Sequence, residues 1–216
     1  MTNLEGLVRG ELRLAGLEDA LAAAPGFASY LDLLLEANVG VNLVSRREAV
    51  PEVLVKRHLL DALEALPLLP AAGARRTRLL DIGSGGGFPA IPLLLARPDL
   101  EGVLVESVGK KARFLVEVIR ALGLTARVVN ARFPGPALEL MKEAFSCDLL
   151  TSRAVAGAGE LVRAALPMLA TGAVAVLWTS EPLLEDLRRS LPRAGLVFRK
   201  SPGADRRGIA RVECFT

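Results

Sequence analysis

A run of glycines directly after a short apolar segment is the feature that most restricts how this chain can fold. The segment 78–82 has the character of a buried strand, and Gly83, Gly85 and Gly87 follow it before a helical pattern begins at Ala90. Glycine lets the backbone adopt a positive φ and approach a ligand closely. In doubly wound sheets, a loop of this kind between a strand and a helix holds nucleotide-like ligands. The sequence therefore predicts a strand–loop–helix unit that binds a ligand.

Short apolar segments alternate with amphipathic ones from residue 78 to the end of the chain. We expect strands at 78–82, 102–106, 126–129, 147–151, 173–178, 196–198 and 209–215, and helices at 90–96, 110–122, 136–145, 160–169 and 182–191. Strands and helices that alternate in this way form a mostly parallel sheet with helices on both faces. The predicted fold class is therefore α/β, with a Rossmann-like sheet.

The first third of the chain has helical patterns only. We expect helices at 4–24, 27–37 and 51–66, with Pro25-Gly26 as the stop of the first helix and Pro51 in the first turn of the third. We therefore divide the chain into an N-terminal helical segment, 1–70, and a Rossmann-like α/β domain, 71–216.

Composition narrows the functional classes. Hydrophobic residues make up 51% of the 216 positions, which excludes a disordered chain. No apolar run reaches the ~18 residues of a membrane span, and the first residues lack the pattern of a secretory signal. Two distant cysteines and a single histidine favour neither a disulfide framework nor a metal site. We expect a cytoplasmic protein, with no metal and no membrane attachment.

The spacing of the glycines distinguishes two kinds of nucleotide loop. The dinucleotide fingerprint G-x-G-x-x-G needs a third glycine where this chain has Phe88. The loop instead resembles the S-adenosylmethionine loop of class I methyltransferases, in which a hydrophobic pair and an acidic residue precede x-G-x-G-x-G. Asp81 and the three glycines match every position. The resemblance implies S-adenosyl-L-methionine as cofactor, with the glycine turn against its methionine part and Asp81 near its ammonium group.

A carboxylate at the end of the second expected strand supports a nucleoside ligand. Glu106 can accept two hydrogen bonds from a ribose diol, a geometry that neutral side chains reproduce poorly. The alternative is a surface glutamate beside a glycine-rich loop without function.

Two observations narrow the kind of methyl acceptor. The stretch Thr151-Ser152-Arg153-Ala154 lacks the prolines and the aromatic residue usual in enzymes that methylate exocyclic amines of adenine or cytosine. Methylation of pyrimidine carbon 5 needs a cysteine nucleophile at the ligand-facing end of a strand, and Cys147 lies at the beginning of its strand. We interpret Cys147 as a core thiol, which leaves an acceptor atom that already has a lone pair.

Further motifs resemble the small-subunit ribosomal RNA methyltransferase G family, also called glucose-inhibited division protein B, from about residue 30 to the end. They are Asn42-Leu43-Val44-Ser45, Arg57-His58-Leu59-Leu60-Asp61, the glycine loop through Pro89, Val105-Glu106-Ser107, Lys110-Lys111-Ala112-Arg113-Phe114-Leu115 and Ser152-Arg153-Ala154. The resemblance implies a class I fold and methylation of guanine N7 in a decoding-region loop of 16S rRNA. It implies 16S rRNA or the small ribosomal subunit as partner, and we expect a monomer.

The candidate site residues form three groups. The cofactor group, in part implied by the resemblance, is Asp81, Gly83, Ser84, Gly85, Gly87, Phe88, Glu106, Ser107, Val108, Phe133, Pro134 and Arg153. The substrate group is Asn42, Arg46, Arg57, His58, Arg206 and Arg207. Arg153 is also the candidate catalytic residue, because its guanidinium can reach guanine O6 or a phosphate; pairing with a carboxylate such as Asp148 is the structural alternative.

The N-terminal candidates also have alternatives. His58 and Asp61 share a helix face, where they could hold the N-terminal segment over the pocket or touch RNA; otherwise a nearby carboxylate satisfies the histidine. A phosphate-binding rim and a scattering of solvated charges are both compatible with Arg46, Arg47, Arg57, Arg75, Arg76, Arg78, Arg206, Arg207 and Arg211. We interpret the run of Lys110, Lys111 and Arg113 as an exposed helix face.

The chain departs from the family pattern at several positions. Phe133-Pro134 stands where the family usually has Ala-Glu, and proline removes a backbone donor. Thr179-Ser180 replaces Lys-Gly, Ala62 replaces a serine and Ala90 replaces a glycine. Two other functions therefore stay open: a methyltransferase for another RNA or a small molecule, and a noncatalytic RNA- or cofactor-binding module.

Overall fold

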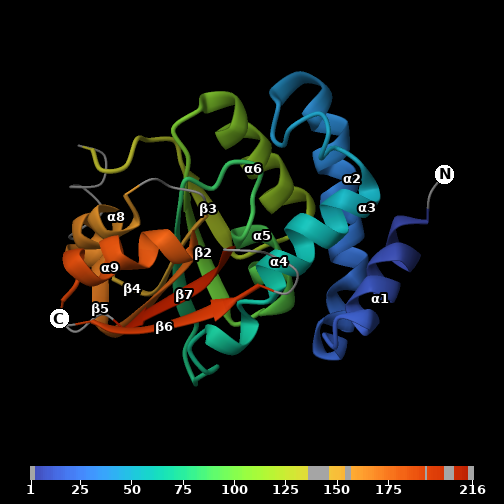
Figure 1. Ribbon diagram of the computed structural model, residues 1–216. Coiled ribbons are helices and arrows are strands. Elements are labelled where there is room, and N and C mark those ends of the chain that lie inside the picture. Colours follow the sequence, from blue (N-terminus) through green and yellow to red (C-terminus); the bar gives the residue numbers. More distant parts are fainter. Residues whose placement is uncertain (1–2, 136–145, 154–156, 193, 202–206, 214–216) are drawn as a thin grey trace.

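A seven-stranded sheet forms the centre of the computed structural model (Figure 1), which describes residues 3–135, 146–153, 157–192, 194–201 and 207–213. The strand order is β3-β2-β1-β4-β5-β7-β6. The strands are β1 Thr77–Ile82, β2 Leu100–Val105, β3 Ala126–Val129, β4 Cys147–Arg153, β5 Leu169–Ser180, β6 Gly195–Lys200 and β7 Arg207–Glu213. The pairs from β3 to β5 are parallel, and β7 is antiparallel to both of its neighbours. The predicted α/β class is confirmed.

The strand order reverses between β1 and β4, which are adjacent in the sheet but separated in the chain by β2 and β3. At such a switch point the two loops after the strands run in opposite directions and leave a crevice beyond the carboxyl ends. The glycine loop follows β1 directly, and Arg153 ends β4. The topology therefore brings the two most informative sequence motifs to one edge of the sheet, which we call the carboxyl edge.

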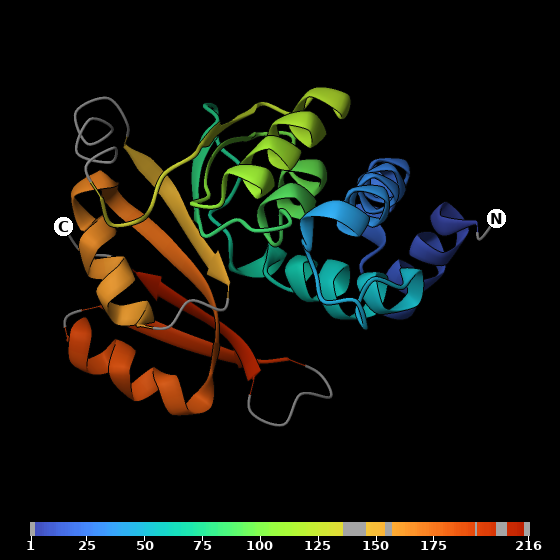
Figure 2. The same ribbon diagram turned by 90° about the horizontal axis from the view of Figure 1, so that it is seen from above.

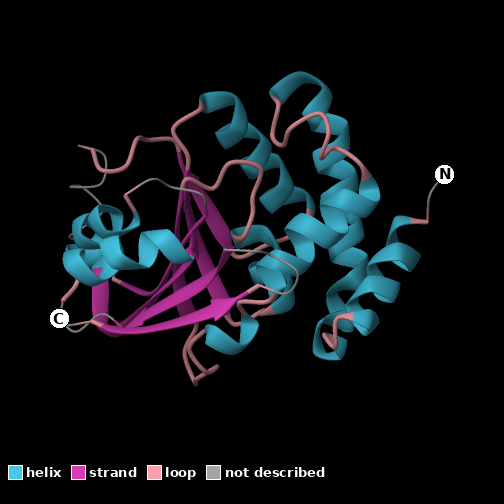
Figure 3. Cartoon of the chain, in the orientation of Figure 1, coloured by secondary structure: helices cyan, strands magenta, loops and turns pink. Residues whose placement is uncertain are grey.

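Successive strand residues point to opposite faces, and each face has its own helices (Figures 2 and 3). Leu79 packs with α5 (Ala90–Ala96), α6 (Gly109–Ala121) and the N-terminal helices, whereas its neighbour Leu80 packs with α8 (Ala158–Ala165) and α9 (Leu184–Ser190). The same alternation separates Val176 from Leu177 in β5. Buried apolar residues on both sides of the strands explain their nearly continuous hydrophobic sequences.

The first expected helix is divided where the sequence did not suggest it. α1 spans Leu4–Leu14, a 3-10 turn spans Glu18–Ala23, and α2 spans Ala24–Val41. The chain turns at Gly16, whose φ is +68°, after α1 ends. Pro25, in contrast, lies in the first turn of α2. Pro25-Gly26 is therefore a helix start and not a stop, since proline lacks only an N–H that has no partner in that turn.

The third expected helix contains a wider turn. α3 (Pro51–Leu54) continues into a π-helical turn at Val55–Leu59 and then into α4 (Leu60–Leu63), with a 3-10 turn at Leu66–Leu68. Single π-turns within helices are frequent at functional sites. This one carries His58, which is buried, next to Arg57, which is exposed.

The later elements agree with the expectations apart from their ends. The helix expected at 160–169 finishes as a 3-10 turn at Leu166–Met168, and the one at 182–191 begins as a 3-10 turn at Glu181–Leu183. The helix expected at 136–145 lies outside the described residues, as does the end of the last strand after residue 213. None of the described helices is long and apolar enough to cross a membrane.

The N-terminal helices share the core on one face of the sheet. Phe27, Leu31 and Leu34 of α2 belong to the same buried cluster as Leu79 of β1 and Ile91 of α5. The hydrophobic contact is thus continuous across residue 70, and the division into two parts at that position stays a prediction.

Truncating Leu31 tests this shared core. Leu31→Ala should lower the free energy of unfolding by about 2–5 kcal/mol, because it removes buried methyl groups and leaves a cavity. The control is Val39→Ala on the same helix, where the side chain is 94% exposed and the change should stay within about 0.5 kcal/mol. Urea unfolding followed by circular dichroism measures both; equal midpoints would show that α2 does not share the core.

Candidate active site at the carboxyl edge of the sheet

The glycines of the loop after β1 serve different purposes. Gly83, Gly85 and Gly87 have φ values of +77°, +57° and +103°. A Cβ at Gly87 would lie 2.7 Å from Ile91 Cγ1, whereas one at Gly85 would meet nothing nearer than the Gly83 carbonyl oxygen at 3.8 Å. Gly87 is therefore required by packing, and Gly85 borders open space in which a ligand can approach the backbone.

Tyr30 of α2 packs against the glycine loop, and the sequence analysis did not identify it as a site residue. Its hydroxyl donates a 2.7 Å hydrogen bond to the Gly86 carbonyl, and its ring meets Phe88 edge-on at 5.2 Å between centroids. Burial raises the pKa of this phenol well above its ordinary value, so it remains a donor. It is the only tyrosine of the chain, but an aromatic residue on the apolar face of a helix is ordinary, and no local signal distinguished it.

Asp81 lies at the carboxyl end of β1 and is 1% exposed. Its Oδ1 accepts a 2.6 Å hydrogen bond from Thr151 Oγ1 in β4, and its carbonyl accepts one from Ser84 Oγ at 3.3 Å. Oδ2 has no partner among the described residues. Burial raises the pKa of this carboxyl to about 6. A buried carboxylate oxygen without a donor is costly, and a cationic ligand group would satisfy it.

Glu106, directly after β2, joins two turns. Its Oε2 accepts from the Gly85 amide at 2.8 Å and its Oε1 accepts from the Val108 amide at 2.7 Å. The residue is 6% exposed, so the alternative of a surface glutamate is wrong. Each oxygen keeps a further lone pair, which leaves room for a ribose diol. The loop after β1 and the turn after β2 are thereby fixed relative to each other.

The remaining cofactor candidates lie around this carboxylate with different exposures. Ser107 and Val108 are exposed, whereas Ser84 is buried, its hydroxyl bound to Asp81. Phe133-Pro134 lies beyond the end of β3, after Asn130, whose side chain donates to the Glu106 carbonyl at 2.7 Å. The structure does not test these assignments, which stay predictions.

Arg153 is held by the N-terminal segment. Its Nη2 lies 3.4 Å from Asp61 Oδ2 and donates to the Arg57 carbonyl at 3.3 Å, and its guanidinium carbon lies 5.9 Å from the centre of the Phe88 ring. Nη1 is buried and has no partner among the described residues. The alternative that Arg153 pairs with a carboxylate is confirmed, but the partner is Asp61 and not Asp148, which binds Arg75 at the other end of β4.

His58 packs with its ring 5.1 Å from the Phe88 ring. Burial, and after it the charge of Arg153, lowers the pKa of His58 to about 4. The imidazole is therefore neutral at pH 7, and its 3.7 Å separation from Glu48 Oε1 is neither an ion pair nor a hydrogen bond. The idea that a carboxylate satisfies this histidine is not supported, since Nε2 is buried without a hydrogen-bond partner in the described part of the chain.

The arginines expected to form one rim lie in different parts of the structure. Arg57 and Arg207 are exposed near the carboxyl edge. Arg46 and Arg47 are exposed in the turn that follows α2, and Asn42 is the exposed left-handed cap of α2. Arg206 lies outside the described residues. The others belong elsewhere: Arg75, Arg76 and Arg78 precede or begin β1, and Arg211 in β7 donates to the Leu68 carbonyl at 3.0 Å. A rim of all nine arginines is therefore wrong.

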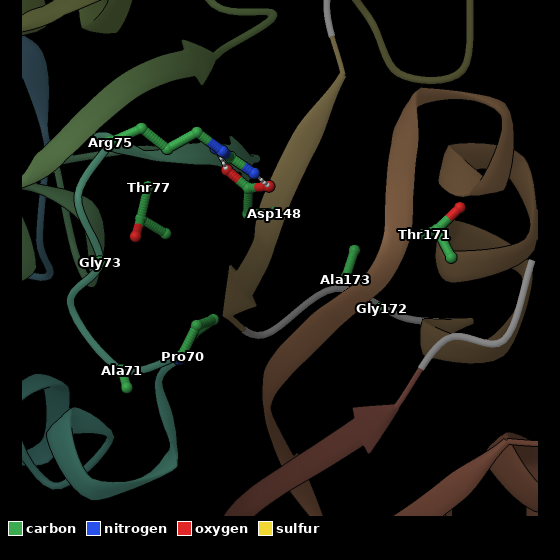
Figure 4. A pocket seen from close by; sticks show the side chains of 9 residues that line it. All are labelled: Pro70, Ala71, Gly73, Arg75, Thr77, Asp148, Thr171, Gly172 and Ala173. Atoms are coloured by element: carbon green, nitrogen blue, oxygen red, sulfur yellow. Dashed lines mark hydrogen bonds and ion pairs between the residues drawn. The ribbon is translucent and has the colours of Figure 1, made fainter.

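A hollow of about 280 Å³ lies at the opposite, amino edge of the sheet (Figure 4). Arg75 and Asp148 form one wall through two hydrogen bonds of 2.7 and 2.6 Å. The hollow reaches Thr77, the first residue of β1, so it is separate from the glycine loop. No group of three histidine, cysteine, aspartate or glutamate side chains in the described ranges could hold a metal ion.

Comparison with known proteins decides the family. Residues 24–190 match the family model described as rRNA small subunit methyltransferase G. The chain belongs to this family. A relative of the same name from Stenotrophomonas maltophilia is 43% identical over 74% of this chain and 69% of its own length. Another from Acidiphilium cryptum is 39% identical over 68% of this chain and 63% of its own length, so that match spans less than two thirds of the relative.

Solved structures share the fold of this chain. A methyltransferase from Pyrococcus furiosus has a TM-score of 0.56 at 12% identity, over 72% of this chain and 83% of that one. The cofactor-bound Rv0187 from MTB has a TM-score of 0.56 at 20% identity, over 88% and 89%. At these identities the likeness shows the fold alone, and it agrees with the predicted Rossmann-like architecture. The predicted N-terminal helical segment is present in this chain as α1 to α4.

The single histidine allows a direct test of this geometry. Its imidazole signals in NMR should titrate with a midpoint near pH 4 and stay unchanged from pH 8 to 5.5. The pKa of His58 is lower in the folded state than its ordinary 6.5. Protonation therefore favours the unfolded state, and the free energy of unfolding falls as the pH drops from 6.5 to about 4. Arg153→Gln should raise the midpoint, and Arg75→Gln at the amino edge should not. A midpoint near 6.5 in the wild type would contradict the buried position.

Proposed function

We propose that this chain transfers the methyl group of S-adenosyl-L-methionine to N7 of a guanine in a decoding-region loop of 16S rRNA. Membership of the methyltransferase G family supports a ribosomal RNA substrate. The observation that carries the cofactor assignment is the arrangement of Asp81 and Glu106 at the tips of adjacent strands, on either side of the glycine loop.

The residues present fit this cofactor. The unpartnered Oδ2 of Asp81 suits an ammonium group, and the open space beside Gly85 suits close approach of the methionine part. Glu106 still has lone pairs for a ribose diol. Ser107, Val108, Phe133 and Pro134 would border the nucleoside from the turns after β2 and β3.

The chemistry requires positioning more than proton transfer. Guanine N7 has an available lone pair at neutral pH, so no general base is needed. The bound cofactor would supply an electrophilic methyl group on a sulfonium. The chain would hold N7 in line with that methyl group, and such positioning can contribute about 7–11 kcal/mol. The neutral His58 adds no positive charge beside Arg153 at this edge.

Arg153 is the residue we assign to the border between cofactor and base. Its Nη1 is a buried donor without a partner in the described structure, and its guanidinium lies beside the Phe88 ring. Contact with guanine O6 would give base recognition, whereas contact with a phosphate would change affinity more than rate. The pair with Asp61 keeps the guanidinium at this border.

Two other functions stay as alternatives. The departures at Phe133-Pro134 and Thr179-Ser180 favour a different RNA or a small molecule as acceptor, because both lie at the carboxyl edge. A noncatalytic module would show no methyl transfer to any acceptor. A measurement of cofactor binding comes first, because a module with a blocked pocket would bind no S-adenosyl-L-methionine whereas a methyltransferase with any acceptor would.

The pH dependence of cofactor binding tests the role of Asp81. Because burial raises its pKa to about 6, this carboxyl is largely ionised at pH 8 and largely protonated at pH 5. Calorimetry should show about tenfold weaker binding of S-adenosyl-L-methionine at pH 5 than at pH 8. The apo protein should change in the opposite sense, since a raised pKa makes Asp81 cost stability as the pH rises through 6.

Asp81→Asn provides the control. It keeps the shape but removes the titration, so its affinity should be weaker and independent of pH across the same range. Thermal shifts of both proteins without ligand report whether the fold itself changes. Identical pH profiles for the two proteins would exclude a contact between Asp81 and the ammonium group.

Mapping modified nucleotides tests the reaction itself. We expect 7-methylguanosine at one position of the decoding-region loop in 16S rRNA from cells with the protein, and none there in cells without it. Reverse transcription after borohydride and aniline cleavage locates the base. Expression of Arg153→Ala should not restore the mark. A mark on another RNA would redirect the assignment to a different acceptor.

A further inference from the structure

The helices α2 and α6 pack against each other (Figure 1). Residues of both helices line a groove of about 270 Å³ that is not part of the glycine loop. Its walls come from the last turn of α2 and the first turns of α6: Ala37, Gly40, Val41, Lys110, Arg113, Phe114 and Glu117. Ala37, Val41 and Phe114 make an apolar floor, and Val39 beside it is 94% exposed. The groove thus combines apolar surface with two cations and one carboxylate.

The groove adjoins the candidate cofactor site. α6 begins at Gly109, directly after the turn that Glu106 holds. The Nη1 of Arg113 reaches back over that first turn, since it lies 3.8 Å from the place where a Cβ on Gly109 would be. The loop after α2 touches the glycine loop as well, because a Cβ on Gly86 would be 3.3 Å from Leu43. An extended ligand that lies in the groove would therefore have one end beside the candidate cofactor site.

The cations here differ from those at the amino edge. Arg75 is paired with Asp148, and Arg76 donates to the Pro98 carbonyl at 3.0 Å. Lys110 and Arg113, in contrast, form no ion pair with any residue that the structure describes. An unpaired cation keeps its full attraction for an anionic partner.

We propose that the α2–α6 groove binds the phosphate backbone of the RNA next to the target nucleotide, with Lys110 and Arg113 as the phosphate contacts. This rests on the proposed function for the identity of the occupant. RNA fits because it is a polyanion and because the nucleotides that flank a base at the carboxyl edge must pass over the adjoining surface. The apolar floor suits a sugar or the edge of a base. The sequence alone indicated only an exposed helix face at Lys110, Lys111 and Arg113. The proposal gives two of these cations a role in binding.

Binding of a 16S rRNA transcript, measured by fluorescence anisotropy over a range of salt concentrations, tests the groove. The double variant Lys110→Ala with Arg113→Ala should bind roughly three- to tenfold more weakly, and its slope of log Kd against log salt should fall by about 0.7 to 1 for each cation that no longer meets a phosphate. Cofactor affinity by calorimetry should stay unchanged, which separates this effect from damage to the Glu106 turn.

Two further variants sharpen the result. Arg120→Ala removes a cation from the last turn of the same helix, outside the groove, and should leave both affinity and salt slope unchanged. Glu117→Gln removes the carboxylate of the groove and should strengthen binding of a polyanion. Weaker RNA binding by Glu117→Gln, or equal losses of affinity for Arg120→Ala and the double variant, would overturn the proposal.

The outcomes also separate this proposal from the function on which it rests. If the wild type binds the transcript through the groove but methylates no guanine, the proposed function fails and the groove stands. If the wild type methylates ribosomal RNA while the double variant binds and reacts equally well, the groove fails alone. Normal binding of naked RNA with loss of binding only to assembled small subunits would assign the groove to a ribosomal protein and refute it as an RNA site.

Discussion

The carboxylate of Glu106 is the contact on which the candidate site depends. It accepts backbone amides from the glycine loop and from its own turn, at 2.8 and 2.7 Å, and so connects the carboxyl ends of β1 and β2. Charge-assisted bonds to backbone amides are short and roughly twice as strong as neutral ones. A loop with three positive-φ glycines has few contacts of its own, and these bonds together with Tyr30 hold it in one conformation. The same carboxylate can thus order the loop before a ligand arrives.

Much of the fold could be predicted because its causes are local. Continuous apolar runs such as 79–82 identify strands buried on both faces, and the glycines after them identify the ligand loop. Pro25-Gly26 shows the limit of this reasoning. Both a helix start and a helix stop suit that pair. The structure has a start, and α2 lies so close to α5 there that a Cβ on Gly26 would be 2.8 Å from Leu95 Cδ2. That tertiary contact between α2 and α5 has no local signal.

The site was predictable in its elements but not in its pairings. Asp81 and Glu106 follow from where strands end, since parallel strands bring their carboxyl ends to one edge. The partner of Arg153 did not follow, because Asp61 comes from a helix nearly a hundred positions earlier, and only the packing of that helix against the sheet joins them. The backbone of Asp61 also accepts the indole N–H of Trp178 at 3.0 Å, so one residue of the N-terminal segment contacts the ends of β4 and β5. Sequence spacing carries no such information.

The two edges of the sheet differ in how completely their polar groups are paired. At the amino edge, the carboxylate of Asp148 accepts from Arg75 and from the Arg78 amide. At the carboxyl edge, buried atoms without partners in the described structure occur on His58, Asp81, Arg153 and Thr179. Burying such groups costs free energy that folding alone does not return. A ligand that satisfies them recovers part of this cost on binding, so an incompletely paired edge favours the bound state. The unpaired polar groups at this edge are therefore the physical reason to propose a ligand site there, beside the glycine loop.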